Sequence, residues 1–256
     1  MDKKKAFDED ETNYDKYRPK YCLELFSNIL EYAKIDSNSK VVEVGCGTGQ
    51  ATEPFLKIGS KIIAIELGEK LATFTSNKFK DYDNFQIQNI PFEEFQCESN
   101  SINLVYSATA FHWIPDEIGY SKVYDMLRSG GTIALFWNIP AIEQGELYDE
   151  IQMIYNQVNG VEKKSNSKET KGNNYRITEA LLEKYGFISF EFHTYKQTRV
   201  LSAEDYISLL NTYSDHITME AKKKNELYHG IKKAINKHGG KIHILDTIDL
   251  YIARKP

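Results

Sequence analysis

The residues of this chain with the clearest chemical meaning are three alternating glycines and one acid. Gly45, Gly47 and Gly49 end an apolar run that begins at Val41, and Glu66 ends a second apolar run over 61–65. Glycine tolerates positive φ and lets a ligand approach the bare backbone, so the pattern predicts a buried strand that ends in a tight turn. Glu66 lies about 20 residues after the first glycine, Gly45. At this spacing a carboxylate at the end of the next strand can accept hydrogen bonds from ribose hydroxyls. Together these features predict a nucleoside-cofactor site.

The spacing of the glycines distinguishes between cofactors. The dinucleotide fingerprint G-x-G-x-x-G has its third glycine one position later than Gly49, where Gln50 stands in this chain. The sequence near the turn also has no arginine cluster or P-loop lysine, so it lacks the cations that bind a phosphorylated ligand. A nicotinamide-dependent oxidoreductase on a related fold is an alternative interpretation, and the early third glycine argues against it.

The segment VVEVGCGTGQAT, residues 41–52, resembles the first motif of class I S-adenosylmethionine-dependent methyltransferases. The resemblance covers most of the chain and is most specific over 41–138. It implies that S-adenosyl-L-methionine is the cofactor. It places Glu43 near the methionine half of the cofactor, which the glycine turn also passes, and it assigns the ribose to Glu66. The residues implied to bind the cofactor at these two strand ends are Glu43, Gly45, Cys46, Gly47, Gly49, Glu66 and Leu67; Cys46 is expected to pack in the turn rather than to act as a nucleophile.

In this family the turn after the third strand faces the adenine. Here that strand is expected over 84–88, and the implied cofactor-binding residues are Asn89, Phe92 and Glu93. Relatives often carry Asp where Asn89 and Asn103 stand. Asn89 could still bond the exocyclic amine through its carbonyl oxygen. Because of these departures, a non-catalytic S-adenosylmethionine-binding protein is a second alternative.

A segment rich in aromatic residues leaves the end of the fourth predicted strand, at 101–107. Its sequence AFHWI resembles that of trans-aconitate methyltransferase-like proteins. Ligands of open α/β sheets bind beyond the carboxyl ends of the strands, so this segment should border the transferable methyl group. Ser107 would then lie at the cofactor and Trp113 would form a wall for the acceptor. His112 could take a proton from an acceptor hydroxyl, or it could support the loop and line the cofactor.

Other residues are candidates for contact with the acceptor. The segment YDKYRPK, which contains Tyr14 and Arg18, resembles the N-terminal segment that lies over the cofactor in small-molecule methyltransferases. Arg18 could meet a carboxylate of the cofactor or of an acidic substrate, or form a surface ion pair. Asn138 ends the fifth predicted strand. Tyr213 belongs to LLNTYSDH, in helices that could cap the cofactor or present a simple packing face.

Helices alternate with apolar strands along most of the chain, which predicts a parallel sheet. The expected fold class is α/β: a doubly wound, Rossmann-like, seven-stranded, mainly parallel sheet with an antiparallel last strand and a helical cap insertion. We expect a single domain over 1–256, with a cap from about 1–33 and 200–238, a charged mobile segment over 1–13 and a polar mobile loop over 160–175. The expected strands are 41–44, 61–65, 84–88, 101–107, 132–137, 188–199 and 242–253; the expected helices are 21–33, 50–58, 69–79, 120–127, 142–158, 178–185, 202–213 and 218–237.

Composition narrows the possible partners. The net charge of −5 gives no electrostatic footprint for nucleic acid, and no apolar run could span a bilayer or serve as a signal peptide. The three cysteines are widely spaced and predict neither a disulfide framework nor a zinc site, and a metal is not expected. The default is a cytoplasmic protein that acts on a small molecule.

These observations predict an enzyme, an S-adenosylmethionine-dependent methyltransferase that acts on a small-molecule acceptor by in-line displacement. A carboxylate is one option for the acceptor and needs no base. A sulfonium methyl group is intrinsically reactive, so the protein mainly has to hold donor and acceptor in line, which can supply about 7–11 kcal/mol. The sequence has no G-x-S-x-G or H-E-x-x-H motif that would indicate a different chemistry.

Overall fold

The computed structural model describes residues 11–160 and 177–256. The described strands are β1 Lys40–Val44, β2 Lys61–Ile65, β3 Phe85–Gln88, β4 Ile102–Ala108, β5 Leu127–Ile142, β6 Ile188–Ser202 and β7 Lys241–Arg254. The described α-helices are α1 Glu11–Tyr17, α2 Leu23–Ala33, α3 Glu53–Ile58, α4 Glu69–Lys78, α5 Asp116–Met126, α6 Glu146–Asn159, α7 Glu179–Lys184, α8 Ala203–Leu210, α9 Ser214–Ile217 and α10 Ala221–Lys237. Two short 3₁₀ helices are η2 Phe92–Glu94 and η3 Phe111–Trp113.

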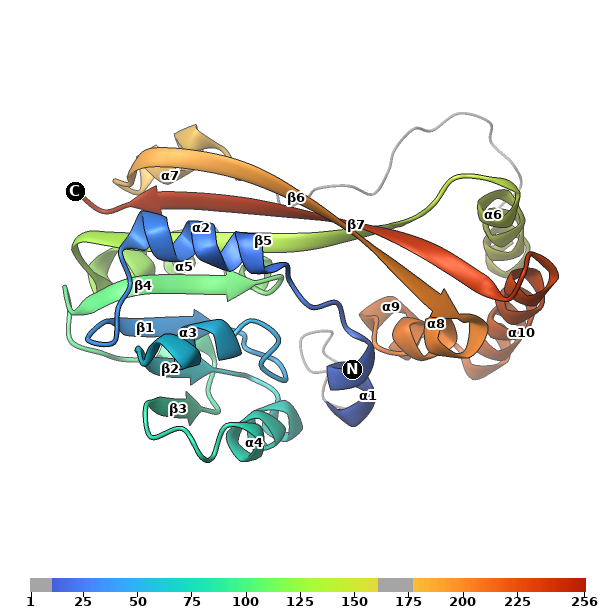
Figure 1. Cartoon of the computed structure of the whole chain (residues 1–256), viewed down its shortest axis with the longest axis horizontal. Helices are drawn as coiled ribbons and strands as arrows, with labels where there is room; N and C mark the ends of the chain where they lie inside the picture. The colour runs from blue at the N-terminus through green and yellow to red at the C-terminus, as the bar shows by residue number, and fades with distance from the viewer. Residues whose placement is uncertain (1–10, 161–176) are drawn as a thin grey trace. The chain divides into compact units, whose positions relative to one another are not determined.

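The strands form one sheet in the order β3-β2-β1-β4-β5-β7-β6 (Figure 1). Strands β3, β2, β1, β4 and β5 pair in parallel. Strand β7 runs the other way: Gly130 N–H donates to Lys255 O, whereas farther along β5 the Glu143 N–H donates to His243 O, so partner numbers fall as β5 advances. The predicted fold class, with an antiparallel last strand, is confirmed.

The register of β1 and β2 positions the predicted site. Val44 pairs with Ile65, so the residues that follow each strand, Gly45 and Glu66, emerge at the same edge of the sheet. Both strands are short runs of β-branched and apolar residues that suit a central strand covered on both faces. The carboxyl ends of β1 and β4 also meet there, because Glu43 pairs with Tyr106.

The described residues divide into two compact units. One, which we call the sheet unit, comprises residues 19–138, 177–195 and 248–256; the other, which we call the helical unit, comprises 11–18, 139–160 and 196–247. The sheet unit holds β1–β4 and α2–α5, and the helical unit holds α1, α6 and α8–α10. Strands β5, β6 and β7 each contribute residues to both units.

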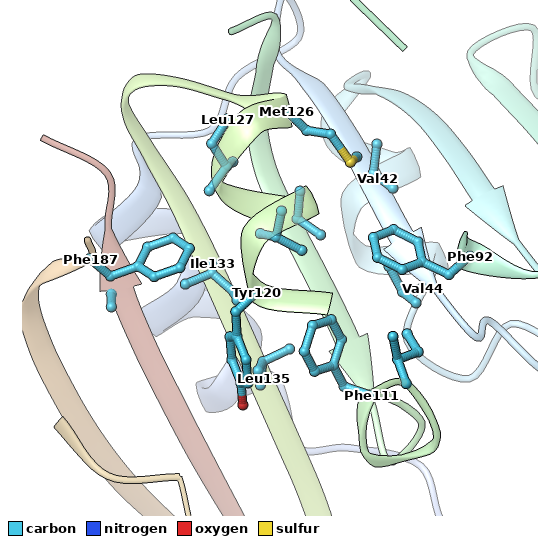
Figure 2. Close-up of a cluster of buried hydrophobic side chains, with 14 of the residues drawn as sticks. Val42, Val44, Phe92, Phe111, Tyr120, Met126, Leu127, Ile133, Leu135 and Phe187 are labelled. Carbon is cyan, nitrogen blue, oxygen red and sulfur yellow. The ribbon is translucent and has the colours of Figure 1, made fainter. Parts of the chain in front are cut away.

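Apolar side chains cover both faces of the sheet in the sheet unit. Val42 of β1, Val105 of β4 and Ile133 of β5 belong to one cluster of buried residues, part of which Figure 2 shows. Their neighbours Val41 and Leu104 belong to a second cluster. Successive side chains of a strand point to opposite faces, so the two clusters lie on opposite faces of the sheet. The helical unit has its own core, contributed by α6, α8, α10 and β7.

Most elements lie within a few residues of the predicted ranges, and several differ. Helix α6 begins at Glu146 rather than at Ile142, which belongs to β5. The expected break at 128–131 lies inside β5, because Gly131 O accepts a hydrogen bond from Lys255 N and the ladder continues through the glycines. Helix α5 begins at Asp116, four positions before the expected start at Tyr120, and its first turn carries acids that stabilise a helix N-terminus. Residues 11–13, expected to be mobile, belong to α1, and α9 occupies part of an expected gap.

Part of the predicted architecture lies outside the described residues. This applies to residues 1–10 and to the expected polar loop apart from Gly160, which ends α6. Within the ranges that the structure does describe, no helix is both long and apolar enough to cross a membrane.

Candidate cofactor site

The glycine turn and Glu66 are joined directly. Oε2 of Glu66 accepts a hydrogen bond from Gly47 N at 2.8 Å, and Oε1 accepts one from Gly68 N at 2.8 Å. The side chain is 9% exposed, so its carboxylate lies at the turn rather than out in solvent. The acid that ends β2 and the turn that follows β1 therefore form one structure.

Three further backbone N–H groups of the turn donate to carbonyl oxygens of the protein itself. Gly45 N donates to Ile65 O at 2.8 Å, Cys46 N donates to the same oxygen at 3.3 Å, and Gly49 N donates to Cys46 O at 2.9 Å. A phosphate-binding loop instead points such N–H groups at its ligand. The arrangement suits a nucleoside held by its sugar better than a phosphorylated ligand.

Helix α4 holds the other side of the turn. The hydroxyl of Thr75 donates to Gly47 O at 2.7 Å, and Lys78 Nζ donates to Thr48 O at 2.9 Å. The peptide groups on either side of Gly47 are thus fixed, one by β2 and one by α4. This contact was not predicted from the sequence. Its signal is a threonine on the face of α4 that otherwise buries Leu71 and Ala72.

At two of the three glycines, a neighbouring side chain leaves no room for a Cβ atom, and the backbone conformation also favours glycine. Gly45, Gly47 and Gly49 have φ values of 70°, 57° and 80°. A methyl group on Gly45 would overlap the side chain of Ala110, and one on Gly49 would overlap the ring of Phe79. The first contact places the segment after β4 against the glycine turn.

Three predicted cofactor residues lie in the interior. Glu43 is 1% exposed; its Oε2 accepts from the Thr52 hydroxyl at 2.6 Å, whereas Oε1 has no hydrogen-bond partner among the described residues. Burial raises the pKa of the Glu43 carboxyl to about 7. Cys46 is also buried, which raises the pKa of its thiol, so the thiolate of a nucleophile is disfavoured. The hydroxyl of Ser107 donates to Val44 O at 2.7 Å and ties β4 to the end of β1.

Asn89 binds the end of β2 through its amide nitrogen. Nδ2 donates to Glu66 O at 2.9 Å and to Leu67 O at 3.1 Å. Only a donor suits two carbonyl oxygens, which explains why asparagine rather than aspartate stands here. The contact of Asn89 Oδ1 with the adenine amine stays a prediction.

The other residues of the predicted adenine turn differ in exposure. The ring of Phe92 is 4% exposed and packs in the core beside Val44, with its centroid 6.3 Å from that of Phe111 (Figure 2). Glu93 is half-buried, and its carbonyl oxygen accepts from Lys122 Nζ at 2.8 Å. Phe92 therefore supports the turn from within the core.

The candidate acceptor residues of the sheet unit follow β4 and β5. Trp137 Nε1 donates to His112 Nδ1 at 3.1 Å, and burial lowers the pKa of His112 to about 4. The half-buried ring of Trp113 lies 4.9 Å from the His112 ring, centroid to centroid. Asn138 N donates to the Thr109 hydroxyl at 3.3 Å, which holds β5 beside the segment after β4. Because β5 continues to Ile142, the prediction that Asn138 ends the strand was wrong. The contribution of Trp137 was not predicted.

The three remaining candidates gather in the helical unit. The guanidinium carbon of Arg18 lies 4.8 Å from the ring centroid of Tyr14 and 4.7 Å from that of Tyr213. Arg18 also donates a hydrogen bond to Thr212 O. The structure thus brings Tyr14, Arg18 and Tyr213 into one cation–π cluster.

Comparison with known proteins agrees with this geometry. Residues 42–135 match the family profile described as a methyltransferase domain. The chain is 30% identical over 148 residues to an uncharacterised methyltransferase-like protein of Schizosaccharomyces pombe, covering 55% of this chain and 56% of that protein. It is 25% identical over 231 residues to an uncharacterised methyltransferase of the same organism, covering 88% of this chain and 84% of that one. The chain therefore spans little more than half the length of the first relative.

Solved structures show the same fold. A candidate type II methyltransferase from Anaeromyxobacter dehalogenans superposes with a TM-score of 0.64 at 14% identity, covering 93% of this chain and 98% of that one. Phosphoethanolamine N-methyltransferase 2 of Haemonchus contortus, in complex with S-adenosyl-L-methionine, superposes with a TM-score of 0.54 at 16% identity, covering 98% of this chain and 56% of that chain.

Proposed function

We propose that this chain is a class I S-adenosylmethionine-dependent methyltransferase that transfers a methyl group to a small-molecule acceptor, with a carboxylate as the first candidate. Its cofactor is S-adenosyl-L-methionine. The observation that carries the proposal is the pair of hydrogen bonds from Gly47 N and Gly68 N to the carboxylate of Glu66.

The carboxylate oxygens of Glu66 are hydrogen-bond acceptors that suit the ribose hydroxyls of this cofactor. Each carboxylate oxygen accepts a backbone hydrogen bond, and a carboxylate oxygen can accept more than one. Two vicinal hydroxyls can therefore donate to the same carboxylate. Because the backbone bonds fix the carboxylate against the turn, the ribose and the methionine half would be held by one rigid element.

The chain's own residues act mainly by positioning. When bound, the cofactor supplies an electrophilic methyl group on a sulfonium. The glycine turn is fixed on one side by Glu66 and on the other by Thr75, so donor orientation costs little reorganisation at the time of reaction. A carboxylate acceptor attacks through an oxygen lone pair, and no proton has to be removed.

The net charge of the chain does not favour nucleic acid as the acceptor. The chain has a net charge of −5, and a protein that neutralises a phosphate backbone needs a basic surface. The proposed acceptor contacts in the sheet unit are His112, Trp113 and Asn138. Tyr14, Arg18 and Tyr213 lie in the helical unit, and their contact with the acceptor stays a prediction from the sequence.

The test is transfer of a labelled methyl group. The full chain is incubated with methyl-labelled S-adenosyl-L-methionine and a panel of small mono-, di- and tricarboxylic acids that includes trans-aconitate. We expect a labelled product whose label is released as methanol in mild alkali, the signature of a methyl ester. Glu66→Ala should abolish labelling, and the exposed control Glu69→Gln should retain it.

Two outcomes would contradict the proposal. Tight cofactor binding without transfer to any acid, amine or alcohol would indicate a non-catalytic binding protein. Failure to bind S-adenosyl-L-methionine together with a fluorescence change on adding NADH would indicate the oxidoreductase alternative.

A further inference from the structure

The pairing of β4 and β5 brings His112 to Trp137. Ala108 at the end of β4 pairs with Phe136 of β5, and η3 follows directly, so the His112 ring meets the next residue of β5. Trp137 Nε1 donates to His112 Nδ1 at 3.1 Å. An indole nitrogen can only donate, so Nδ1 must be the accepting nitrogen and the ring proton of neutral His112 lies on Nε2.

The group that sets this tautomer is itself rigid. Trp137 is 4% exposed and belongs to the core cluster that contains Ile133 and Leu135. Its ring packs edge-on against Tyr251, with centroids 6.0 Å apart. The imidazole is therefore anchored to the core through Nδ1, and the proton of the neutral ring lies on Nε2.

His112 is carried by the segment that borders the cofactor turn. Ala110, two positions earlier, approaches Gly45 so closely that a methyl group on Gly45 would overlap it. This is the edge formed by the carboxyl ends of β1 and β4, where ligands of open α/β sheets bind. The ring is half-buried, and burial holds the pKa of His112 at about 4, so the group is neutral at neutral pH.

We propose that His112 binds the methyl acceptor as a neutral hydrogen-bond donor through Nε2–H, in the tautomer set by Trp137. The inference rests on the proposed function and adds the acceptor class. A fixed N–H donor orients an acceptor oxygen of a carboxylate or carbonyl and leaves the attacking oxygen its own lone pair. It disfavours an ammonium acceptor, whose nitrogen presents only donors.

The same geometry argues against a general base. A base must present an unprotonated nitrogen to the proton that it removes. In His112 that nitrogen is Nδ1, and it already accepts from the indole. Use of Nε2 as a base would need the opposite tautomer, which would set two N–H groups against each other. His112 is therefore assigned to orientation of the acceptor, and the predicted alternative of proton removal is set aside.

The tautomer is tested by nitrogen NMR of the full chain. The protein is labelled with ¹⁵N-histidine and saturated with S-adenosylhomocysteine, and the His112 signal is identified by its loss in His112→Gln. We expect the neutral Nε2–H form from about pH 5.5 to 8.5, since that range lies above a pKa of about 4. Trp137→Phe should produce a mixture of tautomers. An Nδ1–H form or an imidazolium at pH 7 in the wild type would overturn the proposal.

The role toward the acceptor is tested with two substitutions, with trans-aconitate as the probe. His112→Gln keeps an N–H donor near the Nε2 position, whereas His112→Asn keeps a partner for Trp137 near Nδ1 and has no donor at Nε2. We expect the KM for the acid to rise about 10- to 100-fold in the Asn variant, as for a lost hydrogen bond to a charged group, and much less in the Gln variant. Cofactor affinity should stay unchanged in both.

The possible results separate this proposal from the proposed function. Equal KM changes in the two variants would overturn the donor role while the enzyme still transfers methyl groups. If the wild type transfers to trans-aconitate or to any other acid of the panel, that acid replaces the probe. If it transfers to none, the proposed function fails and the donor role fails with it.

Discussion

Gly47 N donates a 2.8 Å hydrogen bond to Oε2 of Glu66, across the parallel pair β1 and β2. The turn and the acid are 19 residues apart in sequence, and the bond makes them a single element. Thr75 fixes the carbonyl oxygen of the same glycine from α4. The proposed cofactor site is therefore pre-organised by contacts within the sheet unit, and its parts can be tested separately.

The two asparagines that stand where relatives often have aspartate should respond differently to substitution. Oδ1 of Asn103 accepts from Lys40 N at 2.9 Å, and a carboxylate can do the same. Asn89 instead donates to Glu66 O and Leu67 O. We expect Asn103→Asp to be neutral, whereas Asn89→Asp should lower the free energy of unfolding by about 1 kcal/mol and weaken cofactor binding.

Urea unfolding and calorimetry check this pair of variants at pH 7 and at pH 4.5. The carboxyl of the Asn89→Asp variant would face two carbonyl oxygens, so its folded-state pKa should be raised. Stability relative to the wild type should then recover as the pH falls and the protonated carboxyl becomes a donor again. Equal behaviour of the two variants would show that Asn89 does not act through its N–H groups.

A substitution at Gly45 should cost more than the same substitution at Gly130. Both glycines have φ near +70°, at 70° and 71°. Alanine therefore costs about 1 kcal/mol of backbone strain at either position. At Gly45 the methyl group also overlaps Ala110, whereas at Gly130 the nearest atom lies 4.0 Å away. Overpacking adds about 1–3 kcal/mol for Gly45→Ala alone.

The measurement is the free energy of unfolding of both alanine variants in urea, with cofactor affinity by calorimetry. Gly45→Ala should also lose cofactor affinity, since the turn must shift, and Gly130→Ala should retain it. A similar loss of stability in the two variants would indicate that Ala110 can move aside freely.

Glu43 should make stability fall with rising pH. Burial raises its pKa from 4.5 to about 7, so between these values the folded state holds a proton that the unfolded state has released. The folded state is then penalised progressively as pH rises from about 4.5 to 7, by a total on the order of 3 kcal/mol, and no further above that range. Glu43→Gln cannot titrate, so its stability relative to the wild type should improve over this window.

Unfolding in urea at pH 5 and pH 7.5 gives the comparison, with the exposed Glu94→Gln as control. The gain of Glu43→Gln over the wild type should be larger at pH 7.5 than at pH 5, and Glu94→Gln should show no such difference. A gain that does not change with pH would mean that Glu43 is ionised in the folded protein throughout.

Local sequence was sufficient for the core of the site. The apolar run over 61–65 matches β2 residue for residue, and Thr178 caps α7 as expected, accepting from Leu181 N. Such features depend on neighbouring residues: a short β-branched run, a turn, or a hydroxyl before a helix. The glycine turn was equally visible, because its positive φ values need glycine.

Contacts between distant segments could not be predicted in this way. Strand β5 continues through its glycines because Lys255 pairs with Gly131, more than a hundred residues away. His112 meets Trp137 only through the register of β4 and β5. Helix α1 is held in the helical unit by the bond from Asn13 to Ser208 O, across 195 positions. Each contact depends on tertiary packing, which overrides local propensity, and neither segment alone contains a sequence pattern that predicts it.

Titration calorimetry of S-adenosyl-L-methionine into the wild type, Glu66→Ala and Glu69→Gln addresses the central claim most directly. Loss of the Glu66 carboxylate removes the proposed ribose acceptors and the anchor of Gly47 N, so we expect the Kd to rise by at least about 10- to 100-fold. Glu69→Gln, at an exposed position in the first turn of α4, should bind as the wild type does. Wild-type affinity in a folded Glu66→Ala protein would contradict the account.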